Sequence, residues 1–387
     1  MIVKKAITLC LFLGLIFLMV SILVMDENNG QVENVHEITA MVLETDNSNV
    51  IQSGISSIGY QFLEVEIMHG EYKGHIVTAD NQLLGKLEID SFFKPGDKIV
   101  AALLIENGEI AQAKALEIYR QDSLLLLFGF FVLCLIIYAG VIGLRALFSF
   151  LAALFIIWKF LIPGLLAGKE PLLLVFLVLT LLTALIMFSI AGFSKKGFAA
   201  FAGTMFGLFV TIMITIFFGE QFALNGMTSP FAETLLFSGH LDLNMQHIFY
   251  AAIIIGASGA AMDIAMDIAA SMEEIKLKKP DINVYELIKS GFNVGRAVIG
   301  TMTTTLLLAY AGGYLSLLML FTTQESSFIR IINLKIIAAE IMRTVVGSIG
   351  LVLVAPITAI IAGWILSTEI KSIFAAVPKM IVRKGAR

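Results

Sequence analysis

Residues 253–274, IIIGASGAAMDIAMDIAASMEE, decide the fold class of this chain. The segment is an apolar run that carries two carboxylates, Asp263 and Asp267. Because they are four residues apart, they share one face of a helix, and Gly256 and Gly259 lie on nearly the same stripe. Small residues let helices approach closely in a membrane, and carboxylates there need polar surroundings. The segment therefore predicts a polytopic membrane protein with a polar seam between its helices.

The composition agrees with a membrane protein. Hydrophobic residues make up 58% of the 387 residues and charged residues 14%, and the mean hydropathy is +0.91. Soluble chains have about 45–50% apolar and about 25% charged residues. The net charge of −4, without a basic groove pattern, gives no support for nucleic-acid binding. Cys10 and Cys134 both lie in apolar runs, which argues against a disulfide framework or a zinc site.

Residues 26–120 form the one sizeable polar region. They contain 16 acidic and 6 basic residues, which gives the region a net charge of −10. Four runs in it alternate as strands do, at residues 37–44, 61–68, 98–105 and 111–118. Turn-forming residues such as Asp80-Asn81 separate them. We expect a small all-β domain here, an antiparallel barrel or sandwich that is OB-like.

Apolar runs of about 20 residues are long enough to cross a bilayer. Residues 6–25 follow Lys4 and Lys5, and we interpret residues 1–25 as an uncleaved anchor, the alternative being a signal peptide. Seven further runs lie at residues 124–144, 147–166, 172–193, 198–218, 247–270, 298–321 and 334–365. The sequence thus predicts about eight transmembrane helices, with the β-domain inserted after the first and a seven-helix domain over residues 121–367.

The positions of Lys and Arg predict the orientation in the membrane. If Lys4 and Lys5 are cytoplasmic, alternate loops place a further set of basic residues inside: Arg145, Lys195, Lys196, Lys276, Lys278, Lys279, Lys289 and Arg296. The basic tail at residues 368–387 is then also cytoplasmic, and residues 26–120 lie outside. We also expect residues 281–288 to form a short cytoplasmic helix.

Asp263 and Asp267 are the first candidate site residues. Counted along the helix, Asp263 falls in the cytoplasmic half of its span and Asp267 near the interface. The functional interpretation is a cation or proton site, because intramembrane carboxylates usually line polar pathways. The alternative is a helix end held by hydrogen bonds and ion pairs, with Arg296 as the partner of Asp267.

The span that follows is rich in hydroxyl groups. Thr301, Thr303, Thr304 and Thr305 cannot all face lipid, and they are candidates for a polar path beside Asp263. The alternative is that each hydroxyl bonds a carbonyl one turn back.

Several residues are candidates for helix packing instead of chemistry. They are Gly256, Gly259, Gly300, Gly312, Gly313 and Pro356. Pro356 lies inside the last apolar run and predicts a kink there, because proline removes a backbone hydrogen bond.

Three charged residues lie deep in other spans. Glu340 and Arg343 are three residues apart on one face, and Lys159 lies in an earlier span. A cluster of these three would carry a net charge of +1. The alternative to a functional role is a pair that fixes the relative position of the helices.

Enzymatic motifs are absent from the sequence. It contains no P-loop, no H-E-x-x-H, no nucleophile elbow and no CxxC. We considered a metal site at His240, Asp242 and His247 against ordinary surface residues and favour the latter. The sequence therefore predicts no catalytic residues, no metal and no cofactor.

Three blocks in the apolar region resemble a known family. They are GASGAAMDIA at residues 256–265, GRAVIGTMTTTLLLAYAGG at residues 295–313, and residues 340–359, which contain Glu340-Ile341-Met342-Arg343. Their order and separation resemble the YibE/F-like bacterial membrane proteins, over residues 124–367. Thr304 departs from the family pattern, where Asn is expected, so an ion held by an amide there is not supported. The resemblance implies a multi-pass protein of the bacterial plasma membrane with an outside β-domain, and it implies no substrate.

Two functions from different classes remain. The first is a transporter or permease that moves a small solute or ion along the seam of Asp263, Asp267, Thr301, Thr304, Thr305, Glu340 and Arg343. The second is a non-transporting scaffold or sensor whose outside β-domain binds a partner protein or an envelope component. A transporter predicts that water reaches the seam, whereas a scaffold predicts paired, dry polar groups.

Overall fold

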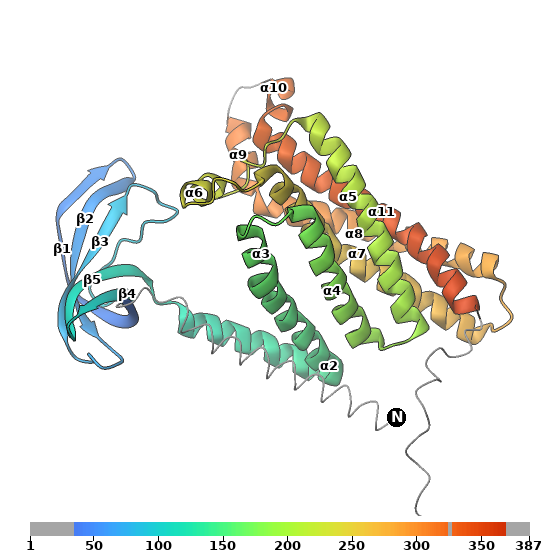
Figure 1. The fold of residues 1–387 in the computed structure, drawn as a ribbon, viewed down its shortest axis with the longest axis horizontal. Helices are drawn as coiled ribbons and strands as arrows, with labels where there is room; N and C mark the ends of the chain where they lie inside the picture. The colour runs from blue at the N-terminus through green and yellow to red at the C-terminus, as the bar shows by residue number, and fades with distance from the viewer. Residues whose placement is uncertain (1–34, 324–326, 369–387) are drawn as a thin grey trace, which may run out of the picture. The chain divides into compact units, whose positions relative to one another are not determined.

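The computed structural model describes residues 35–323 and 327–368, which fall into two compact units that meet between Tyr138 and Ala139. The first unit holds the β-domain and the start of the first described helix, and the second holds the other helices (Figure 1). The anchor predicted over residues 6–25 and nearly all of the predicted tail lie outside the described residues.

The β-domain is a closed five-stranded barrel, which confirms the expected small all-β domain. Its strands follow the order β1-β2-β3-β5-β4, and they pair antiparallel except β3 with β5. This form matches the OB-like expectation. The strands are β1 (Val35–Ser53), β2 (Ser56–Ile67), β3 (Ile76–Leu84), β4 (Lys98–Glu106) and β5 (Glu109–Ile118).

Strand β3 was not predicted from the sequence, because Asp80-Asn81 is typical of a turn between strands. Both residues lie within β3, and the Asn81 side chain is buried. Its Nδ2 donates hydrogen bonds to Gln61 Oε1 at 3.1 Å and to the Ser91 carbonyl at 2.7 Å. Gln61 Nε2 in turn donates to the Phe93 carbonyl at 2.8 Å. Polar side chains inside a barrel are tolerated when they are hydrogen-bonded in this way, and here they anchor the loop that follows β3.

Three side chains of the first unit make contacts where the barrel leads into α2 (Gln121–Ile156). Lys98 Nζ lies 3.1 Å from Asp122 Oδ2, and the Tyr119 hydroxyl donates to Asp122 Oδ1 at 3.0 Å. Lys98 also sits over the Tyr119 ring, 3.9 Å from its centroid. These contacts bond the first turn of α2 to β4 and to the residue that follows β5.

Six helical segments among the described residues are long and apolar enough to cross a membrane. The first, Gln121–Leu166, joins α2, the π-helical turn η1 (Ile157–Leu161) and α3 (Ile162–Leu166). The others are α4 (Pro171–Ala191), α5 (Lys195–Phe222), α7 (Met245–Lys278), α8 (Val284–Gly313) and α11 (Lys335–Ser367). Three short helices complete this part: α6 (Ala232–Phe237), α9 (Leu315–Thr323) and α10 (Phe328–Ile332).

The prediction of about eight spans is therefore wrong. Six candidates stand among the described residues, and the barrel precedes the first of them. The runs expected at residues 124–144 and 147–166 count as one candidate span, Gln121–Leu166, in which two helices meet across a kink at Gly140. The backbone departs from helical geometry at Gly140 (φ 53°, ψ −125°), a conformation that glycine adopts easily.

Two further boundaries differ from expectation. The short helix predicted over residues 281–288 is not separate, because α8 already begins at Val284. The span predicted over residues 298–321 ends instead at Gly313, and Tyr314 separates α8 from α9. The last helix, α11, continues without a break through Pro356.

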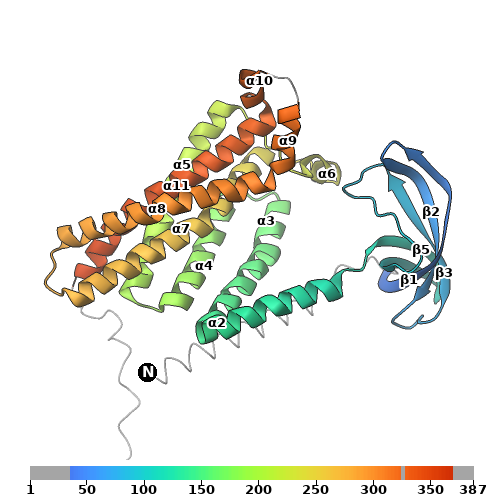
Figure 2. The same ribbon diagram turned by 180° about the vertical axis from the view of Figure 1, so that it is seen from behind.

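The helices α5, α7 and α11 pack against one another and form the centre of the second unit, with α8 on α7 and α11, and α4 on α5 and α7 (Figure 2). Small residues bring α5 and α11 together. Gly203 lies against Thr358, Gly207 against Val354, and Thr211 against Gly350. This is the small-xxx-small arrangement common between membrane helices.

Polar contacts tie the helix ends together. At one end, Lys195 Nζ donates to the Thr368 carbonyl at 2.6 Å and Lys196 Nζ lies 2.9 Å from Glu273 Oε2. We call this the basic end, which the charge pattern predicts to be cytoplasmic. At the opposite end, His247 Nδ1 lies 2.8 Å from Glu170 Oε1 and links α7 to the start of α4.

Candidate functional site

The residues of the predicted polar seam lie in two separate places in the structure. Glu340 and Arg343 lie half-buried on α11, whereas Asp263 and Asp267 lie on an exposed face of α7. We define the buried cluster as Tyr310, Tyr314, Glu340 and Arg343.

An ion pair forms the centre of the buried cluster. Arg343 Nη1 lies 3.3 Å from Glu340 Oε1, and the two side chains are only 15% and 14% exposed. The same Nη1 donates a hydrogen bond to the Tyr314 hydroxyl at 2.7 Å. The guanidinium also lies 5.5 Å from the Phe249 ring centroid, within the range of a cation–π contact. Groups from α7, the α8–α9 junction and α11 thus hold Arg343 in place.

Three buried polar atoms of the cluster have no hydrogen-bond partner among the described residues. They are Glu340 Oε2, Arg343 Nε and the Tyr310 hydroxyl. Leaving such an atom unpaired costs about 1–3 kcal/mol. The set contains an acceptor, a donor and a hydroxyl that can do either, so it matches a small polar molecule that both donates and accepts.

Gly256 makes room for the hydroxyl of Tyr310. A Cβ added to Gly256 would lie 2.6 Å from that oxygen, which is closer than side chains approach one another. The absence of a side chain at position 256 therefore lets α8 place Tyr310 against α7.

Lys159 was predicted as a third charge of this cluster. It lies in η1, whose main packing partners are α3 and α4, and the ion pair of the cluster joins Glu340 to Arg343. The participation of Lys159 in a group of three charges stays a prediction.

Asp267 and Arg296 do not form the expected ion pair. Both side chains are exposed, and in the ranges 35–323 and 327–368 neither has a charged group within ion-pair distance. Their helices nevertheless place them at the same level, because Gly295 lies against Ile268 where α8 crosses α7. The two side chains therefore point away from the contact between their own helices.

The threonines of α8 mostly bond their own helix. The hydroxyls of Thr301, Thr303 and Thr305 donate to carbonyls three or four residues earlier, at 3.0–3.1 Å. Thr301, Thr304 and Thr305 are exposed. They lie on the outer surface of the bundle and do not line an enclosed path within the described residues.

The glycines singled out in the sequence differ in their surroundings. Within the described part of the chain, Gly259, Gly300, Gly312 and Gly313 have no other residue within 4 Å of an added Cβ. The described residues thus leave open space at these four positions, and their packing role stays a prediction. Close helix packing occurs instead at Gly203 and its neighbours on α5, which the spacing Gly203-x-x-x-Gly207 would have indicated.

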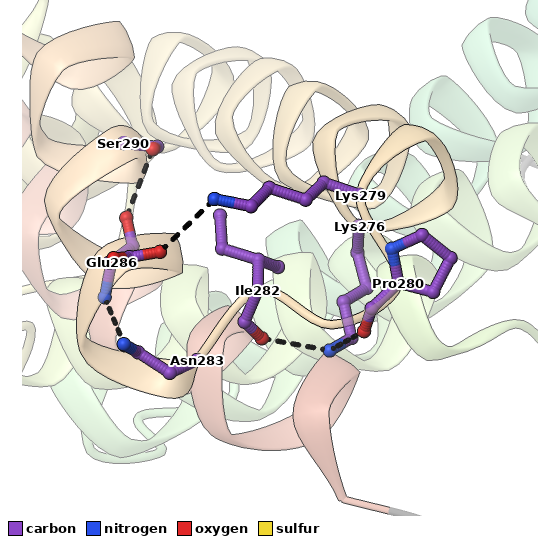
Figure 3. Close-up of polar contacts among 7 residues, drawn as sticks. All are labelled: Lys276, Lys279, Pro280, Ile282, Asn283, Glu286 and Ser290. Carbon is purple, nitrogen blue, oxygen red and sulfur yellow. Dashed lines mark hydrogen bonds and ion pairs between the residues drawn. The ribbon is translucent and has the colours of Figure 1, made fainter.

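The connection between α7 and α8 is fixed by hydrogen bonds (Figure 3). Lys276 Nζ donates to the carbonyls of Pro280 at 2.7 Å and Ile282 at 3.0 Å, which satisfies groups beyond the end of α7. Asn283 caps α8, because its side-chain oxygen accepts from the Glu286 N–H at 2.8 Å. The two helices are therefore held in one register.

Among the described residues, no group of three His, Cys, Asp or Glu side chains is arranged to hold a metal. His247 instead contacts Glu170, which also caps α4 by accepting from the Leu173 N–H at 2.6 Å. Burial raises the pKa of the Glu170 carboxyl, but these hydrogen bonds outweigh it and lower the pKa below its usual value. Glu170 is thus an ionised helix cap.

Comparison with known proteins places the chain in a family. The model of the YibE/F-like protein family matches residues 127–368, and that of the YibE/F family N-terminal domain matches residues 24–118. Searches of curated proteins and of solved structures found no match. The first match covers more than half of the chain and includes the whole buried cluster. The chain therefore belongs to the YibE/F-like family of multi-pass membrane proteins.

Proposed function

We propose that this protein is a permease that binds a small polar solute at the buried cluster and moves it across the plasma membrane. The observation that carries the proposal is the incomplete pairing of the cluster. An ion pair that only fixed helix positions would have its remaining donors and acceptors bonded to the protein. Here Glu340 Oε2, Arg343 Nε and the Tyr310 hydroxyl are buried without a partner among the described residues.

The charge balance of the cluster narrows the class of solute. Glu340 and Arg343 neutralise each other, so the site offers no net charge to an ion. It offers one free acceptor and one free donor, which supports a solute that is neutral or zwitterionic. Phe249 and Tyr314 add aromatic faces beside the guanidinium.

The depth of the buried cluster in the helix bundle supports entry of the solute from one side of the membrane. Phe249 and Glu340 lie within six residues of the starts of α7 and α11, so the cluster is roughly 8 Å inside those helix ends. These ends are opposite to the basic end. In the proposed orientation, with the barrel outside and the basic end cytoplasmic, the solute enters from outside.

A thermal-shift screen of the purified protein tests this function. The panel is a set of amino acids, small amides and zwitterionic amines. A member that binds at 100 times its dissociation constant should stabilise the protein by about 2.7 kcal/mol and raise Tm. The shift should be lost in Tyr310→Phe and kept in the matched control Tyr138→Phe, since Tyr138 is fully exposed in the first unit. A shift that survives in Tyr310→Phe would place the binding site elsewhere.

A second candidate function, a membrane-anchored sensor or scaffold, is supported by the surface of the barrel. Ile51, Ile58 and Leu84 are aligned across three neighbouring strands, and all three are exposed. Ile55 at the tip of the same hairpin is 85% exposed. Such a row of apolar side chains suits a partner protein. A scaffold needs no water at Tyr310, so solvent access to that position separates the two candidates.

A further inference from the structure

The helices α7 and α8 each carry an exposed stripe on which small and charged residues recur. Successive members are three, four or seven residues apart, which keeps them on one helix face. The α7 stripe consists of Gly259, Asp263, Asp267 and Glu274, and the α8 stripe of Lys289, Asn293, Arg296, Gly300 and Thr304.

The two stripes are opposite in charge. The α7 stripe carries three carboxylates and no base, and the α8 stripe carries Lys289 and Arg296 and no acid. Across residues 35–323 and 327–368, none of these five charged side chains forms an ion pair or a hydrogen bond. Only Asp263 falls well inside the expected span, where an unpaired carboxylate is costly. The other four lie at or beyond the predicted cytoplasmic interface, where opposite charges on facing helices attract one another.

Where α7 packs against α8, acidic residues of the α7 stripe lie at the same depth in the membrane as basic residues of the α8 stripe. Gly295 lies against Ile268, and Gly291 lies against Met272. The two helices therefore run antiparallel, and a residue four positions later on α7 lies at the depth of a residue four positions earlier on α8. The same register puts Asp267 level with Arg296, and Glu274 level with Lys289. Acid and base thus occur at equal depths on neighbouring helices that do not pair them.

We propose that two copies of this chain associate through these stripes, with α7 of one copy packed against α8 of the other. A two-fold axis along the membrane normal leaves the depth of every residue unchanged. An acid and a base that lie at the same depth in one chain therefore also lie at the same depth in two chains related by this axis. Asp267 of each copy then meets Arg296 of the other, and Glu274 meets Lys289. The surface is self-complementary, as a two-fold interface requires.

The small residues of the stripes fit the same arrangement. Gly259 and Gly300 have open space at their Cβ positions within the described chain, and small residues let membrane helices approach closely. In the same register Asp263 is level with Gly300 and Gly259 with Thr304. Asp263 therefore enters the interface opposite a residue without a side chain, next to the hydroxyl of Thr301.

Disulfide cross-linking between differently tagged copies tests the interface. Both copies carry Cys10→Ala and Cys134→Ala; one adds Asp267→Cys and the other Arg296→Cys, and they are expressed together and oxidised in native membranes. Because a disulfide needs Cα atoms about 4.4–6.8 Å apart, only close helices react. We expect a band of twice the chain mass that carries both tags. The control pairs Arg296→Cys with Phe206→Cys, an exposed position on α5, and should give no such band.

Charge reversal provides a second measurement. Asp267→Arg and Arg296→Asp should each weaken dimerisation at least about tenfold, whereas the two together in one chain should restore it. The dimer fraction is measured by native mass spectrometry from the membrane extract. The proposal is overturned if no band carries both tags, or if the combined variant is as weak as the single ones. It is also overturned if Asp267→Cys and Arg296→Cys in one chain form only an intrachain disulfide.

Discussion

Replacing Arg343 with alanine is expected to destabilise the helix bundle by about 3–5 kcal/mol, the usual cost of breaking a buried ion pair by removing one partner. The loss arises because Glu340 then keeps a charge inside the membrane with no counter-charge within 4 Å among the described residues. The Tyr314 hydroxyl also loses the donor that contacts it at 2.7 Å. Unfolding in detergent, followed by circular dichroism, measures the change in the free energy of unfolding.

The control for this prediction is the double variant Glu340→Met with Arg343→Met. Replacing both partners of a buried pair by apolar residues of similar size is often neutral or stabilising. The double variant should therefore be more stable than Arg343→Ala, although it removes more polar groups. If Arg343→Ala were as stable as the unmodified protein, Arg343 would not be the neutralising partner of Glu340.

The second large effect is expected from Gly203→Leu, which should weaken the packing of α5 on α11 by about 1–3 kcal/mol or more. An added Cβ at Gly203 would lie 2.9 Å from the Cα of Thr358, so backbone rather than a flexible side chain would have to move. Small residues continue along the same contact at Gly207 and Gly350. The helices would have to separate, and neighbouring contacts would be lost with them.

Gly312→Ala is the control, because no other described residue lies within 4 Å of its added Cβ. Alanine is favoured over glycine in a helix by about 1 kcal/mol, so this variant should be neutral or slightly more stable. The same unfolding measurement compares the two variants. If Gly203→Leu and Gly312→Ala changed the free energy of unfolding equally, the result would contradict the close contact between α5 and α11.

The sequence was a good guide to features that depend on local pattern. Apolar length predicted most of the helices, and the alternation of residues predicted four of the five strands. The fifth strand was missed because Asn81 is polar and local rules take Asp-Asn for a turn. Its burial depends on hydrogen bonds to Gln61 and to the loop after β3, which are contacts between distant parts of the chain.

The candidate site was only partly predictable for the same reason. Glu340 and Arg343 were found because charges inside apolar runs stand out, and their spacing indicated a pair. The roles of Tyr310 and Tyr314 were not recognised, since aromatic residues are common in such helices. The sequence also could not show that Asp263 and Asp267 face outward on α7, because the face a helix buries depends on which neighbours pack against it.

A permease that binds its solute at the buried cluster requires that water and solute reach this cluster. The most direct test is Tyr310→Cys, in a chain with Cys10→Ala and Cys134→Ala, treated in intact cells with a small membrane-impermeant thiol reagent. We expect modification at position 310 from the outside, and no modification of the control Val354→Cys, which is fully buried between α5 and α11. If position 310 stayed unmodified from either side in the folded protein, the cluster would be a dry structural pair. The sensor or scaffold function would then be favoured over transport.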